Sequence, residues 1–129
     1  QAQGRYSEAE PFYVRSLQIR EQQLGADHPS TATSLNNLAA LYQAQGRYSE
    51  AEPFYVRSLQ IYEQQLGADH PDTARSLWNL AVLYFNLNQL TKAEPLIDRA
   101  VAVFERRLGA DHPHTINARE WWQAIHQNR

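Results

Sequence analysis

Apolar residues recur at three- and four-residue steps along most of this chain, a spacing that predicts helices. In residues 30–45 they fall on a single helix face, which carries Ala32, Leu35, Leu38, Ala39 and Tyr42. Gly46 follows, and glycine often ends a helix because it adopts the left-handed backbone without strain. One period later Asn88 takes that place, and asparagine is the next most tolerant residue there. Residues 30–45 therefore predict a helix with a defined end.

A second apolar pattern follows in residues 49–66. It opens with Ser49 and Glu52 in the spacing of a capping box, which Thr91 and Glu94 repeat. Pro53 falls within the first turn, where its missing N–H has no intrahelical acceptor to lose. The buried stripe expected here consists of Ala51, Tyr55, Leu59, Tyr62 and Leu66. This pattern also predicts a helix, and Asp69-His70-Pro71 then begins the next one.

The two patterns alternate and predict six helices, at about residues 7–24, 29–45, 49–66, 71–87, 91–108 and 113–128. We call the pattern of 29–45 an A helix and that of 49–66 a B helix, so the order is B-A-B-A-B-A. The linkers contain only a few residues, so neighbouring helices are expected to be antiparallel. No strand pattern competes, and the predicted fold class is all-α.

The chain repeats itself with a period of 42 residues. Residues 1–29 and 43–71 are identical except that Arg20 becomes Tyr62, and Gly-Ala-Asp-His-Pro stands at 25–29, 67–71 and 109–113. Such a period indicates a solenoid, in which each unit buries its apolar face against its neighbours. We expect a single domain over residues 1–129 that contains an unpaired B helix, two repeats (29–66 and 71–108) and a last helix.

The last helix, 113–128, departs from the pattern. An apolar stripe remains at Ala118, Trp121, Trp122 and Ile125, but the chain then becomes polar. A polar, atypical helix is typical of a solenoid end, so we predict that it caps the array. The first residues match the middle of a repeat, and we interpret the chain as a segment of a longer array.

The composition argues against several classes of function. The net charge is −2 and no cysteine is present, which argues against nucleic-acid binding and excludes thiolate zinc sites. No apolar run approaches the ~20 residues of a membrane span, and no secretion signal opens the sequence. We therefore expect a cytoplasmic protein with neither a nucleic-acid nor a membrane partner.

The repeat resembles the tetratricopeptide repeat, and its 42-residue period with Ala-Glu-Pro and Leu-Gly-x-Asp-His-Pro is similar to the kinesin light chain type. The matching positions are Leu35, Leu38, Ala39, Tyr42, Ala51, Tyr55, Leu77, Leu80, Ala81, Tyr84, Ala93 and Ile97. The closing proline of the family pattern is absent, since Glu63 and Glu105 stand there. The resemblance implies a right-handed superhelix of antiparallel helix pairs that acts as a protein-binding scaffold.

The resemblance also implies where a ligand binds. A helices of this family line a concave groove that holds an extended peptide, and an asparagine in each repeat often bonds the peptide backbone. Asn37 and Asn79 occupy that position, and Trp121 is the third equivalent. A carboxamide can both donate to and accept from a backbone amide. The alternative is that these asparagines only bond neighbouring helices.

Neighbouring groove positions are expected to set selectivity, and by helical spacing they are Thr33, Asn36, Ala40, Gln43, Arg75, Trp78, Val82, Phe85 and Asn86. Asn36 and Gln43 are replaced one period later by Trp78 and Phe85, aromatic residues typical of ligand anchors. Arg75 is a candidate to pair with a carboxylate. Packing of the two aromatic rings on an adjacent helix is an equally strong interpretation.

The sequence gives little support for metal binding or catalysis. His28, His70 and His112 recur once per repeat, so they stand about 10 Å apart and cannot share one metal ion. They are expected to cap helices or stabilise loops. Glu50 and Glu52 point to different helix faces, and no catalytic motif is present. We predict no enzyme activity, no metal site and no cofactor.

A second functional hypothesis is open at this point. The chain opens with a B helix without its A partner and closes with an A helix without its B partner. Each end is expected to leave an apolar face, and two such faces could stack head to tail. The chain would then be a structural spacer or self-assembling segment, with the binding function elsewhere.

Overall fold

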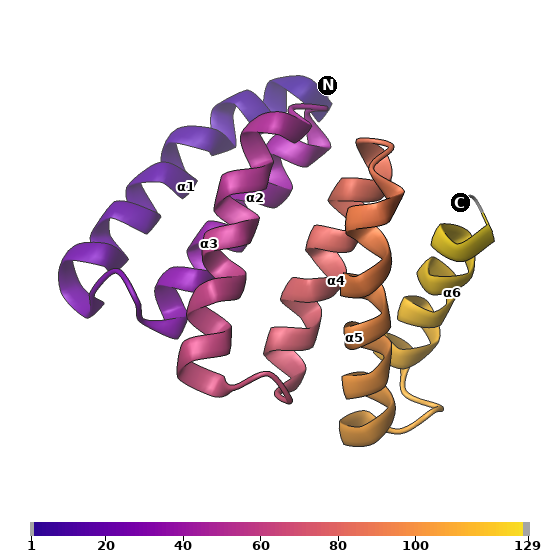
Figure 1. The fold of residues 1–129 in the computed structure, drawn as a ribbon. Coiled ribbons are helices and arrows are strands. Elements are labelled where there is room, and N and C mark those ends of the chain that lie inside the picture. The colour runs from indigo at the N-terminus through magenta and orange to yellow at the C-terminus, as the bar shows by residue number, and fades with distance from the viewer. Residues whose placement is uncertain (1, 128–129) are drawn as a thin grey trace. The chain divides into compact units, whose positions relative to one another are not determined.

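The computed structural model describes the backbone of residues 2–127 and the side chains from Arg5 to Gln127. In this range the chain forms helices and no strands, and Figure 1 shows their succession. The helices are α1 (Ala2–Leu24), α2 (Pro29–Ala44), α3 (Tyr48–Leu66), α4 (Pro71–Asn86), α5 (Leu90–Leu108) and α6 (Pro113–Gln127). The predicted all-α class is confirmed, and most predicted helix ends are correct to within one residue.

The start of α1 is the main difference, because this helix begins at Ala2 instead of near residue 7. The second copy of the block has a turn at this point. There Gly46 has a φ of 78°, and the Arg47 N–H closes the turn by donating to the Tyr42 carbonyl over 2.8 Å. In the first copy the matching residues, 4 and 5, belong to α1.

A histidine caps the start of each A helix. The Nδ1 atoms of His28, His70 and His112 each accept a hydrogen bond of 3.0 Å from the backbone N–H two residues later. Proline follows each histidine, at a position where its missing N–H costs nothing. The predicted capping role of these histidines is confirmed.

The capping boxes predicted at Ser49 and Thr91 are wrong. Helices α3 and α5 begin one residue earlier than expected, and Gln89 caps α5 without a side-chain hydrogen bond. The tight turn before the helix accounts for this start. The Gln89 N–H donates to the Tyr84 carbonyl over 2.8 Å, which directs the backbone into the helix before Thr91 is reached.

The chain divides into two compact units, residues 1–65 and 66–129. In the first unit α2 packs against α1, and Ser58 of α3 donates to the Ala32 carbonyl of α2 over 2.9 Å. The buried residues of α2 include Ala32, Leu35, Leu38 and Ala39, each at most 1% exposed. The apolar stripe predicted for residues 30–45 is therefore part of the core of this unit. The stripe predicted for residues 49–66 is buried except at Leu66, the last residue of α3, which is only half-buried.

In the second unit α5 packs against both α4 and α6. All twelve positions that match the family signature are buried, six in each unit. In α6 the predicted stripe is correct for Ala118 and Ile125, which are fully buried, but not for Trp122, which is 40% exposed. Trp122 is rotated by about 100° from Trp121 on the helix, so both rings cannot enter the core. Trp121 is half-buried.

Among the residues that the structure describes, no helix is both long and apolar enough to cross a membrane.

Candidate binding surface of the A helices

The predicted ligand-binding positions all retain exposed surface. Five are exposed and six are half-buried, and none belongs to the fully buried core. The exposed ones are Thr33, Asn37, Ala40, Arg75 and Asn86, and the half-buried ones are Asn36, Gln43, Trp78, Asn79, Val82 and Phe85.

In the first unit a pocket of about 380 Å³ lies between α1 and α2. It is lined by Arg5, Tyr6, Ala9, Tyr13, Asn37, Ala40, Leu41 and Ala44. Of the predicted positions, Asn37 and Ala40 line this pocket. Asn37 is exposed and borders this pocket.

In the second unit a pocket of about 420 Å³ lies between α4 and α6. Its lining residues are Trp78, Asn117, Glu120, Trp121 and Ala124. We call it the tryptophan pocket. Two large aromatic rings, one amide and one carboxylate meet here, a combination suited to an apolar side chain with polar neighbours.

Sequence reasoning identified Trp78 but missed three of these residues. Asn117, Glu120 and Ala124 follow Thr33, Asn36 and Ala40 by two periods of 42 residues, so they hold the same places on an A helix. They were overlooked because α6 was interpreted only as a cap. The repeat period itself is the signal that identifies them.

The Trp78 ring packs on two neighbouring helices as well as lining the pocket. Its centroid lies 5.9 Å from that of Phe104 in α5 and 6.2 Å from that of His114 in α6. Its Nε1–H is buried and has no acceptor among the described residues. Burial lowers the pKa of His114, and the nearby His112 and Arg75 lower it further. A neutral imidazole therefore borders this ring.

Phe85 likewise packs on the adjacent A helix, with its ring centroid 5.5 Å from that of Trp121 and nearly perpendicular to it. Such edge-to-face pairs are favourable beyond their buried area. The packing interpretation given above for both aromatic residues is thus realised. Trp78 both packs on adjacent helices and lines the tryptophan pocket.

Thr33 and Gln43 are engaged by tyrosines of α3. The Thr33 hydroxyl lies 2.7 Å from the Tyr62 hydroxyl, and the Tyr55 hydroxyl donates to Gln43 Oε1 over 2.8 Å. Burial raises the pKa of Tyr55 to about 12, so this donor keeps its proton at neutral pH. These two positions contribute to helix packing.

The other predicted positions lie outside both pockets. They are Asn36, Arg75, Asn79, Val82 and Asn86. The Asn36 Oδ1 is buried without a hydrogen-bond partner among the described residues. Arg75 is exposed and does not reach the lining of the tryptophan pocket.

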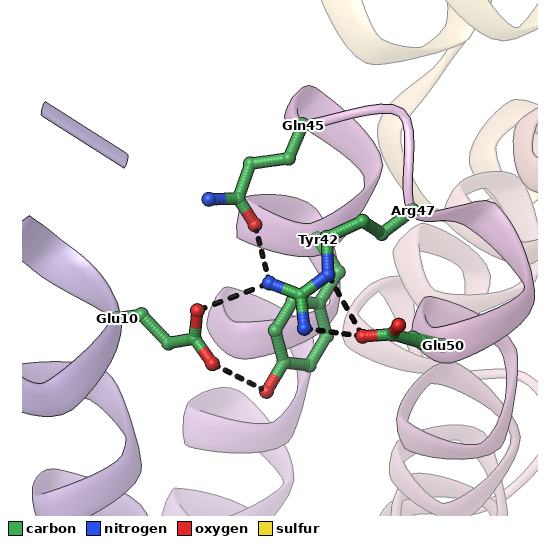
Figure 2. Close-up of polar contacts among 5 residues, drawn as sticks. All are labelled: Glu10, Tyr42, Gln45, Arg47 and Glu50. Carbon is green, nitrogen blue, oxygen red and sulfur yellow. Dashed lines mark hydrogen bonds and ion pairs between the residues drawn. The ribbon is translucent and has the colours of Figure 1, made fainter. Parts of the chain in front are cut away.

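A charged cluster in the first unit serves to join helices. Figure 2 shows Arg47 between Glu10 of α1, Gln45 and Glu50, with Tyr42 beneath its guanidinium. Arg47 Nη1 lies 3.0 Å from Glu10 Oε1, and Tyr42 donates to the other oxygen of Glu10 over 3.2 Å. Burial and the Glu10 carboxylate raise the pKa of Tyr42, which leaves it a neutral hydrogen-bond donor.

A second cluster joins α5 to α6. Glu94, Asp98 and His126 offer ligand atoms that all lie within 4.8 Å of one another, the arrangement of a candidate cation site. Asp98 Oδ1 is already contacted by Trp122 Nε1 at 2.7 Å and His126 Nε2 at 2.9 Å. Hydrogen bonding between the two helices therefore accounts for the cluster. Its members come from separate helices, which is why sequence spacing did not reveal it.

Solved structures of similar fold support the same architecture. BtubC (BKLC) from P. vanneervenii is 25% identical with a TM-score of 0.87 over 96% of this chain. A Podosopora anserina kinesin light chain-like protein with nearly identical TPR-like repeats is 27% identical with a TM-score of 0.89 over 97%. The chain spans 50% and 59% of the lengths of these two proteins. No curated protein sequence matches it.

The family model of the tetratricopeptide repeat matches residues 1–64, 35–96 and 72–120, which together cover most of the chain. Proteins of this family are in general scaffold modules for protein interactions. Buried signature positions, helix pairs and the related solved structures agree with the match. The chain belongs to the tetratricopeptide repeat family and is a solenoid of the kinesin light chain-like type.

Proposed function

We propose that this chain binds a segment of a partner protein along its A helices, with the tryptophan pocket as the anchoring site. The observation that carries the proposal is the lining of this pocket. Each of its five residues is related by the repeat period to a predicted groove position, and together they line a pocket of about 420 Å³ between two A helices. No catalytic arrangement accompanies them among the described residues, so the proposed role is binding alone.

The identity of residue 78 supports a binding role. The first A helix carries Asn36 where the second carries Trp78, which packs edge-on against Phe104. Phenylalanine could fill that space without burying an N–H that lacks an acceptor, a cost of about 1–3 kcal/mol. If residue 78 served only for packing, phenylalanine would avoid this cost. The larger indole ring, which also lines the pocket, offers a reason for tryptophan at this position.

The lining also indicates what the ligand carries. Glu120 is the only charged residue among the five, and it stands beside the indole rings. An apolar or aromatic ligand side chain would stack between Trp78 and Trp121, and an adjacent lysine or arginine would pair with Glu120. We expect the bound segment to combine one apolar anchor with one basic residue.

The asparagines would hold the ligand backbone. Asn117 lines the tryptophan pocket, and Asn37 lines the pocket of the first unit. Each carboxamide can donate to a backbone carbonyl and accept from a backbone N–H whatever the ligand sequence. Asn79 is half-buried and would contribute through its remaining exposed edge.

Selection from a random peptide library tests the proposal. The selected peptides are expected to share an apolar residue next to a basic one, and Trp121→Ala is expected to weaken their binding at least tenfold. Glu120→Lys should reverse the preference from basic to acidic peptides. Glu105→Lys is the matched control, because Glu105 is paired with Arg119 and lies outside the tryptophan pocket.

Two results would contradict the proposal. Peptides that bind equally well to the Trp121→Ala chain would place the binding surface elsewhere. A library that yields no binder, while the chain keeps its helical circular dichroism, would favour the spacer hypothesis.

A further inference from the structure

The cluster between α5 and α6 has a simpler counterpart in the first unit. There Glu10 of α1 accepts a hydrogen bond of 3.2 Å from the Tyr42 hydroxyl of α2. Two periods of 42 residues later, Glu94 holds the position of Glu10 and His126 holds that of Tyr42. The last repeat thus keeps the carboxylate of this contact between helices. It replaces a hydroxyl, which acts only as a hydrogen-bonding group here, by an imidazole, which is also a common metal ligand.

A neighbouring position changes from apolar to acidic. The earlier copies carry Val14 and Val56 where the last repeat carries Asp98. Asp98 follows Glu94 by one helical turn, so both carboxylates lie on the same face of α5. His126 Nε2 is 2.9 Å from Asp98 Oδ1, and His126 Nδ1 is 3.7 Å from Glu94 Oε1. Two substitutions therefore convert a contact between two side chains into a group of three, all of types that bind metal ions.

The charge of this group favours a cation. Two carboxylates at this distance repel each other, and His126 balances them only when it is protonated. Within the described part of the chain, no lysine or arginine is ion-paired with Asp98. Hydrogen bonding holds the cluster together, but both bonds to Asp98 use Oδ1 and leave Oδ2 available. A divalent ion would use that oxygen and neutralise both carboxylates.

The group is sheltered but accessible to an ion. The side chains of His126 and Glu94 are 18% and 23% exposed, whereas that of Asp98 is 48% exposed. An ion can therefore enter beside Asp98 and meet ligands that two packed helices hold in place. The Trp122 Nε1–H, 2.7 Å from Asp98 Oδ1, orients the Asp98 carboxylate. Metal ligands in proteins are commonly supported by such a hydrogen bond.

We propose that Glu94, Asp98 and His126 bind one zinc ion between α5 and α6. Imidazole and carboxylate ligands suit zinc, with bonds of about 2.0–2.2 Å. Tetrahedral geometry then places ligand atoms roughly 3.3 Å apart, and the ligand atoms here already lie within 4.8 Å of one another. The ion replaces the hydrogen bond between His126 and Asp98, and the proton of that bond passes to solvent.

This site reverses the sequence-based expectation of no metal site, which rested on the histidines that recur once per repeat. It is separate from the tryptophan pocket, because none of its three residues lines that pocket. The zinc proposal therefore does not depend on the ligand proposed above.

Calorimetric titration of the 129-residue chain with zinc chloride tests the site, and we expect one ion to bind per chain. Asp98→Asn and Glu94→Gln should each weaken zinc binding at least tenfold, because an amide keeps the shape of the carboxylate but not its charge. Glu52→Gln is the matched control, since Glu52 holds the position of Glu94 in a repeat that carries Val56 and Tyr84 at the other two positions. It should leave the zinc affinity unchanged. Circular dichroism checks that each variant is folded.

Cobalt(II), a paramagnetic substitute for zinc, locates the ion because it broadens the NMR signals of nearby protons. The Trp122 indole N–H is bonded to Asp98, so its signal should be the first indole signal to disappear. His112 and His114 are the competing ligands, with ring centroids 4.9 Å apart. The His114 ring packs on Trp78, so an ion bound there would broaden the Trp78 signal first.

Three results would overturn the proposal. The parent chain could bind no zinc, the Asp98→Asn and Glu94→Gln chains could bind it as tightly as the parent, or cobalt could broaden the Trp78 signal before that of Trp122. Each of these results would leave the cluster with its hydrogen-bonding role alone.

Discussion

At the scale of single residues, histidine is an unusual helix cap that this chain uses once per repeat. The Nδ1 atom accepts only when it carries no proton, so each capping imidazole is held in the tautomer with its proton on Nε2. The side chain then satisfies a backbone N–H that the helix itself leaves without a partner.

This arrangement predicts a graded response at position 70. His70→Ala should lower the free energy of unfolding by about 1 kcal/mol, because the Asp72 N–H loses its acceptor. His70→Asn should cost less, since asparagine is a strong cap. Urea unfolding at neutral pH measures both variants, and an equal loss in the two would contradict the capping role.

A second prediction at this scale concerns alkaline pH. The pKa of Tyr55 is about 12 in the folded chain and about 10 when unfolded. Between these values the folded state binds more protons than the unfolded state, so stability falls as pH rises from 10 to 12. At pH 11 the loss from Tyr55 is about 1.4 kcal/mol.

The matched variant for this prediction is Tyr55→Phe. It should be less stable at pH 9, because Gln43 loses its hydrogen bond, and it should lose less stability than the parent chain between pH 9 and pH 11. Urea unfolding at both pH values measures this, and parallel losses in the two proteins would show that Tyr55 is not the titrating group.

At the scale of helices, the end of the chain differs from the previous repeat at three positions whose side chains contact one another. Asp98, Trp122 and His126 replace the valine, leucine and tyrosine that the previous repeat carries as Val56, Leu80 and Tyr84. In the structure these three new side chains form one hydrogen-bonded cluster between α5 and α6. They therefore act as a unit.

This coupling predicts non-additive mutations. Asp98→Val alone should lower the free energy of unfolding by about 1 kcal/mol, because Trp122 and His126 lose a shared partner. Adding Trp122→Leu and His126→Tyr should restore most of that loss, since the two ring N–H groups that lost Asp98 are then removed as well. Denaturant unfolding of the single and triple variants measures both free energies of unfolding. A triple variant less stable than Asp98→Val alone would contradict the coupling.

Helix positions and core residues followed from the sequence because apolar periodicity dictates them. Leu35, Leu77 and their partners are buried as predicted. Local capping signals were less reliable. The boxes at Ser49 and Thr91 failed because backbone hydrogen bonds of the preceding turn begin the helix earlier.

The lining of the candidate binding surface could be predicted from the sequence only in part. Asn37, Ala40 and Trp78 line pockets, but Thr33 and Gln43 are engaged by tyrosines of α3. Helical spacing identifies which face a residue occupies. It does not identify which neighbouring side chain reaches that residue first, and this decides whether it packs or remains open.

At the scale of the whole molecule, the repeats share one helical pattern, and substitutions at single positions change the side chains that the A helices present. The same A-helix positions hold Asn36 in α2, Trp78 in α4 and Glu120 in α6. Between α2 and α4 the core residues Leu35, Leu38 and Ala39 recur as Leu77, Leu80 and Ala81, while this partly exposed position varies. Such variation is what a solenoid needs to bind one partner through several repeats, which is the central claim for this chain.

The three tryptophans provide the most direct test of that claim. Trp78 and Trp121 line the tryptophan pocket, whereas Trp122 lies outside it with its indole N–H bonded to Asp98. In a nitrogen–proton correlation spectrum each indole N–H gives one resolved signal. Titration with a selected peptide should shift the Trp78 and Trp121 signals and leave that of Trp122 unchanged. A shift confined to Trp122, or none at all despite measured binding, would contradict binding at this pocket.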